Sequence, residues 1–269
     1  MNGTNNIFTK FLCKFYVYIL LLLLYAPILV LIVFSFTNTR IIGNWDGFSF
    51  DLYKSLFKDK EIMQAFGNTF IVAVSSAFVS TVIGTLGAIG IFYSKKRTKA
   101  VMEAIGNIPV INAEIVTALS LTILFVFCSA KFNFLTLLIG HVVLTVPFVV
   151  LSVRPKLIQM DPNIYEAALD LGATPKKALR KIIIPEIMPG VFSGFILSIT
   201  LSLDDYIITA FTRDTAFQTL STYVYGITSK KGTLPPSLRA LTTVITIIAL
   251  IILIIVNINS KEKKEENKR

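Results

Sequence analysis

The chain has 269 residues, of which 54% are hydrophobic and only 16% are charged, and its mean hydropathy is +0.71. This composition excludes an ordinary soluble domain and indicates a polytopic membrane protein. The net charge of +10 would suit a nucleic-acid-binding protein, but the basic residues flank the apolar runs in the way that membrane topology requires.

Six apolar runs are long enough to cross a hydrocarbon core about 30 Å thick. They lie at about residues 15–36, 66–92, 104–130, 134–153, 187–211 and 237–258. The first is too long for a signal peptide and lacks a small-residue cleavage site, so we expect an uncleaved helix. With both termini in the cytoplasm, 17 Lys and Arg fall inside and 9 outside. We therefore predict an all-α fold of six spans in a single transmembrane domain, residues 1–269, with both ends cytoplasmic.

Two features precede the third run. Leu52, Leu56 and Phe57 recur at helical spacing among charged residues, which predicts an interfacial helix on the outer face. In the second run, Gly84, Gly87 and Gly90 form a small-residue face that favours close helix packing.

The third run contains the sequence IPVINAEIVTALSL. Pro109 is expected to break the start of its helix. We expect Glu114, together with Asn112, to face the protein interior, because a carboxylate in contact with lipid is strongly disfavoured. His141, the only histidine, begins the fourth run, and we interpret it as a hydrogen-bonded interface residue and not as a proton relay or ligand.

The inner loop at about residues 154–186 is the most structured polar part of the chain. Asp161 and Pro162 are typical of a helix start, Gly172 of a left-handed helix end, and Thr174 with Pro175 of a second start. We expect Pro185 to end that second helix. On the first helix Ile164, Ala168 and Leu171 share one side, which fits either docking into a partner's groove or packing on the protein itself.

The fifth run, LSITLSLDDYIITAFT, carries two adjacent carboxylates, Asp204 and Asp205. Together they oppose membrane insertion by about 5–7 kcal/mol. On a continuous helix they point about 100° apart. Asp205 then shares a polar stripe, formed by Ser198, Ser202, Asp205, Thr209 and Thr212, and is the stronger candidate for lining an aqueous path. Asp204 would flank the path or pair at a helix interface.

Two other features carry no chemistry of their own. Cys13 and Cys128 have neither disulfide-framework nor metal-site spacing, so no metal site is expected. The mixed-charge C-terminal tail, SKEKKEENKR, is interpreted as a solvated topology anchor.

The loop sequence EAALDLGATPKKALRKIIIP resembles the EAA signature of ABC-importer permease subunits. Glu166, Ala167, Ala168, Gly172, Ile182 and Pro185 stand at the signature's spacing, and Ile184 replaces its usual leucine. The resemblance implies a type I (MetI-like) permease fold in which these residues couple to a separate ABC ATPase dimer. It also implies that the chain has no cofactor of its own, because the partner binds ATP and Mg²⁺. The absence of a GxxxxGK[ST] phosphate loop agrees with this.

The resemblance narrows to the spermidine/putrescine permeases of the PotC type, through NWDGFSFDLYKSL, IPVINAEIVTALSL, HVVLTVPFVV, YEAALDLGA and LSLDDYIITAF in that order. It implies a bacterial cell membrane location and, as partners, a sister permease, an extracellular polyamine-binding protein and membrane lipids, without nucleic acid. Glu114, Asp204 and Asp205 would form an anionic path, and the candidate aromatic contacts are Tyr206, Phe211, Phe125 and Phe127. SKKGTLPPSL, up to Leu238, is more basic than the family's outer loop.

Three alternatives remain. An intramembrane aspartyl protease needs two facing carboxylates, whereas neighbours on one helix point apart. A secondary transporter should show an internal repeat with paired broken helices and needs no EAA loop. An ABC permease for another small cation or metabolite is the third alternative, and the acidic spans argue against an anionic substrate.

Overall fold

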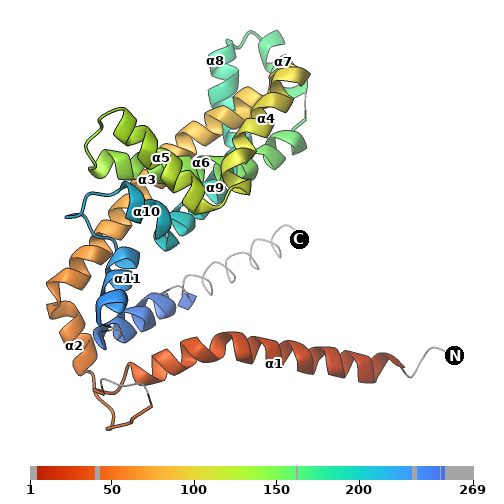
Figure 1. Ribbon diagram of the computed structural model, residues 1–269. Coiled ribbons are helices and arrows are strands. Elements are labelled where there is room, and N and C mark those ends of the chain that lie inside the picture. The colour runs from red at the N-terminus through yellow and green to blue at the C-terminus, as the bar shows by residue number, and fades with distance from the viewer. Residues whose placement is uncertain (1–4, 40–42, 162, 232–234, 249, 252–269) are drawn as a thin grey trace. The chain divides into compact units, whose positions relative to one another are not determined.

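The computed structural model describes residues 5–39, 43–161, 163–231, 235–248 and 250–251, with side chains from Cys13 onward. These residues form helices and connecting segments without a strand among them (Figure 1). In chain order the helices are α1 (Asn5–Phe34), α2 (Asp51–Lys58), α3 (Lys60–Phe92), α4 (Lys96–Ile111), α5 (Glu114–Phe127), α6 (Phe134–Gln159), α7 (Asn163–Asp170), α8 (Pro175–Ala178), a π-helical turn (Leu179–Ile183), α9 (Ile184–Asp204), α10 (Ile207–Thr212) and α11 (Leu220–Lys231). The predicted all-α class is confirmed.

Four helical segments are long and apolar enough to cross a membrane: Cys13–Phe34, Lys60–Phe92, Phe134–Gln159 and Pro175–Asp204. A fifth span results if the bent pair α4 and α5 counts as one. Ser237–Ile248 is apolar but shorter, and the rest of the predicted run 237–258 lies mostly outside the described residues. The count of six spans therefore stays a prediction.

The chain divides into two compact units, one formed by Met1–Met63 with Lys230–Arg269 and the other by Gln64–Ser229. In the first unit, α2 buries Leu52 and Leu56, while Phe57 is 69% exposed. The helix is confirmed, with two of its three apolar residues facing the protein, whereas its position on the outer membrane face stays a prediction. The rings of Phe36, Phe48, Phe50 and Tyr53 stack beside it.

The centre of the second unit is α6, which contacts α4, α5, α9 and α10. Two helices approach it through glycines. A Cβ on Gly84 of α3 would lie 2.7 Å from Cβ of Val149, and one on Gly194 of α9 would lie 3.2 Å from Cα of the same residue. Close packing at Gly84 confirms part of the predicted small-residue face, whereas Gly90 faces open space.

The third predicted span is not one helix. α4 and α5 meet at an angle of 105°, because Asn112 and Ala113 both adopt extended backbone torsions. Pro109 lies inside α4, three residues before the break and not at it. Its missing N–H weakens the last turn of α4.

Pro185 does not end a helix, contrary to the expectation from sequence. It occupies the first turn of α9, directly after the π-helical turn. There the amide of Ile184 donates to the carbonyl of Leu179, five residues back. This wider turn accommodates the proline that a regular α-helix would exclude, and Pro175–Asp204 runs on as a single 30-residue segment.

Candidate functional site

The fifth apolar run breaks at the aspartate pair. α9 ends at Asp204, and Asp205 has extended torsions (φ −65°, ψ 128°) before α10 begins. The Asp205 carboxylate accepts hydrogen bonds from the amides of Ile208 (3.1 Å) and Thr209 (2.8 Å) and from the Thr209 hydroxyl (2.8 Å). Asp205 therefore caps the start of α10, where anionic groups are favoured by the free N–H groups of a helix.

His141 of α6 lies between the two sides of this break. Its Nδ1 is 2.7 Å from the Ser202 hydroxyl, and its Nε2 is 2.9 Å from the Thr209 hydroxyl. Nε2 is also 3.7 Å from the Asp205 carboxylate. His141 is 1% exposed, and both ring nitrogens are hydrogen-bonded, so the interpretation of a satisfied interface histidine is confirmed.

The hydrogen bonds around His141 form a chain in which the donor and the acceptor of each bond can be assigned. The Thr209 hydroxyl donates to Asp205 and must accept from Nε2 of His141, so that Nε2 carries the proton. Nδ1 of a neutral imidazole then accepts from Ser202, which in turn accepts from Ser76 of α3 at 3.1 Å. A single neutral tautomer satisfies every group, and the chain joins α3, α6, α9 and α10.

The predicted polar stripe is therefore corrected in one respect. All five of its members, Ser198, Ser202, Asp205, Thr209 and Thr212, are buried, and they face the inside of the unit. The continuous helix assumed for them does not exist, because the Asp205 cap interrupts it. In this structure the Asp205 side chain is 1% exposed, so it lines no open surface.

Asp204 and Glu114 are both exposed, and packing brings them near each other. The Thr122 hydroxyl donates to the carbonyl of Phe211 (3.1 Å), and Ala118 packs against Ile208. Glu114 lies one turn before Ala118 on α5, and Asp204 lies four residues before Ile208, on the other side of the break. Because α5 and α10 pack side by side and run in the same direction, the three predicted carboxylates lie at neighbouring helix ends.

An aromatic pair borders these carboxylates. The rings of Tyr206 and Tyr225 are 4.4 Å apart between centroids, and the Ser221 hydroxyl donates to the backbone carbonyl of Asp205 (2.8 Å). Of the other aromatic candidates, Phe125 is buried, whereas Phe211 is 36% and Phe127 85% exposed. Sequence reasoning missed Tyr225, because nothing in its local pattern connects α11 to the aspartate pair.

At the inner loop, α7 is followed by Gly172 with φ +83°, and the Thr174 hydroxyl accepts from the amide of Lys177 at 3.4 Å. Asp161 accepts from the amide of Asn163 at 2.9 Å, so the helix–turn–helix expected from the sequence is confirmed. Pro162 lies outside the described residues. Of the EAA positions, Glu166, Ala167, Gly172 and Pro185 are exposed, Ala168 is buried and Ile182 is half-buried.

The two sides of α7 differ from the expected arrangement. Ile164 and Tyr165 pack against the buried cluster of α6 and the π-helical turn, whereas Leu171 is 89% exposed. Leu171 therefore does not share the packed side with Ala168, because the helix ends at Asp170. The ring of Tyr165 contacts that of Tyr93 (5.3 Å between centroids), and burial, with a smaller contribution from Tyr165, raises the Tyr93 pKa.

Within the described part of the chain, no group of three or more His, Cys, Asp or Glu side chains could hold a metal ion. Cys13 and Cys128 are both free thiols on the surface.

Comparison with known proteins gives a consistent result. A family model, "Binding-protein-dependent transport system inner membrane component", matches residues 80–261. The chain is 36% identical over 222 residues to the Escherichia coli spermidine/putrescine transport system permease protein PotC, covering 82% of this chain and 83% of the relative. It is 33% identical over 229 residues to the Escherichia coli putrescine transport system permease protein PotI, covering 82% and 81%.

Among solved structures, the fold is similar to a chain of a bacterial ABC transporter involved in the import of the acidic polysaccharide alginate. The TM-score is 0.71 at 16% identity, and the match covers 96% of this chain and 98% of that chain. At this identity the likeness concerns the fold alone.

The cap at Asp205 predicts that the two neighbouring aspartates differ in their effect on stability. Asp205→Ala leaves two amides and a hydroxyl buried without their acceptor, which should cost about 1–3 kcal/mol. Asp204→Ala removes an exposed group and should cause no loss. Thermal unfolding of the purified protein in detergent measures both variants, and equal melting temperatures would contradict the cap.

Proposed function

The chain belongs to the binding-protein-dependent transport system inner membrane components, and from this membership we propose that it is the permease subunit of a polyamine importer. As a member of this family it is a multi-pass membrane transport subunit and not itself an enzyme. The resemblance first drawn on the EAA loop is thereby confirmed. The substrate class is supported by relatives named for spermidine and putrescine transport.

The observation that carries the proposal is the position of two exposed carboxylates, Glu114 and Asp204, at the ends of helices that packing brings side by side. A polyamine is a flexible alkyl chain with several ammonium groups, and each ammonium needs an acceptor once its water is removed. Carboxylates on different helices supply those acceptors at separate points. The faces of Tyr206 and Tyr225 add cation–π attraction beside them.

Asp205 has another role in this proposal. Its carboxylate is occupied by the amides of Ile208 and Thr209 and by the Thr209 hydroxyl, so it holds the break that presents Asp204. On a continuous helix, Asp205 is the stronger candidate for substrate contact. In this proposal Asp204 and Glu114 contact the substrate instead, and Asp205 positions them.

The energy source in this proposal is ATP hydrolysed by a separate ABC ATPase dimer, which binds the ATP and Mg²⁺. The docking element is α7 with its following turn, including Glu166, Ala167 and Gly172. Leu171, at 89% exposure, is suited to insert into the partner's groove. A sister permease completes the pathway, an external binding protein delivers the substrate, and both termini lie in the cytoplasm.

The carboxylate proposal predicts the effect of neutral isosteres on transport. Glu114→Gln and Asp204→Asn should each lower polyamine uptake roughly tenfold, because the ammonium group loses a negatively charged acceptor and keeps only a neutral one. Glu61→Gln, which removes an exposed acid in the first turn of α3, is the matched control. Uptake of labelled spermidine and putrescine is measured together with basal ATP hydrolysis. Wild-type uptake in both site variants, or uptake that survives the removal of ATP, would contradict the proposal.

The docking proposal predicts that Leu171→Ala weakens retention of the ATPase subunit roughly tenfold, as expected for truncating an interface anchor. Leu86→Ala is the control, since Leu86 is also an exposed leucine (57%) but lies in α3, outside the inner loop. Binding of the ATPase to the permease in nanodiscs gives the readout. The relative uptake of different polyamines should stay unchanged, and a shifted ranking would argue against a pure docking role.

A further inference from the structure

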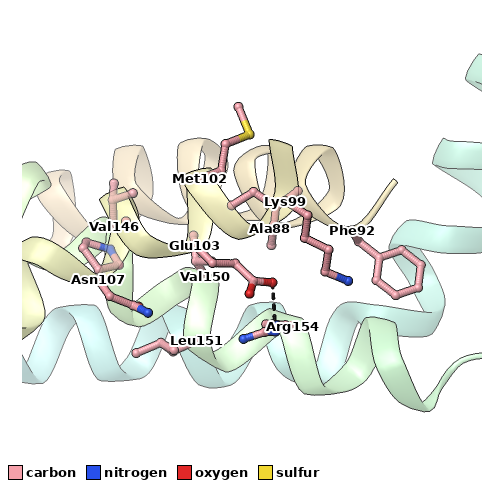
Figure 2. A pocket seen from close by; sticks show the side chains of 13 residues that line it. Ala88, Phe92, Lys99, Met102, Glu103, Asn107, Val146, Val150, Leu151 and Arg154 are labelled. Atoms are coloured by element: carbon pink, nitrogen blue, oxygen red, sulfur yellow. Dashed lines mark ion pairs between the residues drawn. The ribbon is translucent and has the colours of Figure 1, made fainter. Parts of the chain in front are cut away.

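A small cavity lies between α3, α4 and α6, at the end of the second unit that carries α7 and α8 (Figures 1 and 2). Its volume is about 80 Å³. The walls are mostly apolar, and the residues that matter below are Ala88, Phe92, Lys99, Gly106, Val150 and Arg154. The carboxylate path described above does not include any of them.

Charge inside this cavity is unevenly compensated. Glu103 of α4 pairs with Arg154 of α6 at 2.8 Å, as Figure 2 shows, so these two charges cancel. Lys99 is a further cation in the lining, with its Nζ 5.3 Å from the centroid of the Phe92 ring. Among the described residues it has no ion-pair partner. The cavity therefore carries one uncompensated positive charge at an otherwise apolar wall.

The helix that covers the cavity is itself unusually exposed. No residue of α4 is buried, and Val101, Met102, Ile105 and Ile108 are each 47–60% exposed. In a membrane this apolar surface contacts lipid or another subunit. The cavity is thus continuous with an apolar helix surface, and its polar end is basic, because Lys95, Lys96 and Arg97 precede Lys99 in the chain.

We propose that this cavity binds an anionic phospholipid of the cytoplasmic leaflet, with part of an acyl chain between α3, α4 and α6 and the phosphate at Lys99. The proposal rests on the membrane orientation given above, which places this end of the unit in the cytoplasm. Size favours a lipid: pockets that enclose a small molecule measure about 300–1,000 Å³, so a cavity of about 80 Å³ admits only a segment of a longer ligand.

The same charges exclude the transported substrate from this site. A polyamine is a multiple cation and is repelled by Lys99 and the basic residues before it. An anionic headgroup is attracted by them, and basic pockets between helices on the cytoplasmic side of membrane proteins commonly bind such lipids. The long side chain of Lys99 reaches the headgroup level while its methylenes stay in the apolar wall.

Two substitutions separate the chain-binding and headgroup-binding parts of the site. Gly106 lines the cavity, and a Cβ placed there meets no atom within 4 Å, so Gly106→Leu adds bulk to the cavity lining without a clash of its Cβ. Gly67→Leu is its control, because Gly67 is also unobstructed but lies outside the cavity. Lys99→Gln removes the uncompensated charge of the lining, and Lys181→Gln removes an equal charge at an exposed position of the inner loop, outside the cavity.

The experiment uses the full chain in nanodiscs that contain phosphatidylglycerol and phosphatidylcholine, and native mass spectrometry counts the lipids retained after delipidation. Wild-type protein should retain phosphatidylglycerol in preference to phosphatidylcholine. Lys99→Gln should reduce that preference roughly fivefold, the effect of one lysine at an anionic surface, and Gly106→Leu should abolish retention of both lipids. The two controls should behave as wild type.

Three results would overturn the proposal. Equal retention of the two lipids by the wild type would remove the charge argument, and full retention by Gly106→Leu would place the lipid elsewhere. An equal loss in Lys99→Gln and Lys181→Gln would reduce the effect to diffuse surface charge. The readout requires no transport, so its failure leaves the proposed polyamine function intact.

Discussion

The Asp205 carboxylate, buried between α9 and α10, is the group on which the site depends. A buried charge is strongly disfavoured unless hydrogen bonds satisfy it, and here two amides and the Thr209 hydroxyl do so. Because the amides of Ile208 and Thr209 must point toward this carboxylate, α9 ends at Asp204 and the chain is extended at Asp205 before α10 begins. His141 and Ser202 extend the same network into α6 and α9, so the break is held by the core of the unit.

The break matters for both the proposed cation path and the proposed ATPase contact. It leaves Asp204 exposed at the end of α9, near Glu114 at the start of α5, which is the arrangement that a multiply charged amine requires. The other end of the Pro175–Asp204 segment is the EAA loop, reached without interruption through the π-helical turn. One helical segment thus connects the proposed ATPase contact to the proposed cation path.

Sequence reasoning predicted the features that depend on local chemistry. Gly172 at positive φ and the Thr174 cap follow from residue type and spacing, and the helical class follows from the long apolar runs. The helix breaks depended on partners distant in sequence. The sequence placed Asp205 on one face of a continuous helix, but its carboxylate accepts from the amides of Ile208 and Thr209 and caps a new helix. The widened turn at Leu179 lets Pro185 lie within a continuing helical segment. The sequence put Leu171 on the same side as Ile164 and Ala168, because periodicity cannot locate the end of α7 at Asp170 to one residue.

The central claim is that Glu114 and Asp204 face the cation path, while Asp205 and its neighbours are buried and hold the helix break that presents Asp204. Cysteine accessibility tests it most directly, in a background where Cys13 and Cys128 are replaced, with the assembled transporter and a cationic thiol reagent. The account predicts that Glu114→Cys and Asp204→Cys react and that spermidine slows both reactions, whereas Ser202→Cys and Thr209→Cys stay unreactive. Rapid, spermidine-sensitive labelling at position 209 with none at position 204 would contradict it.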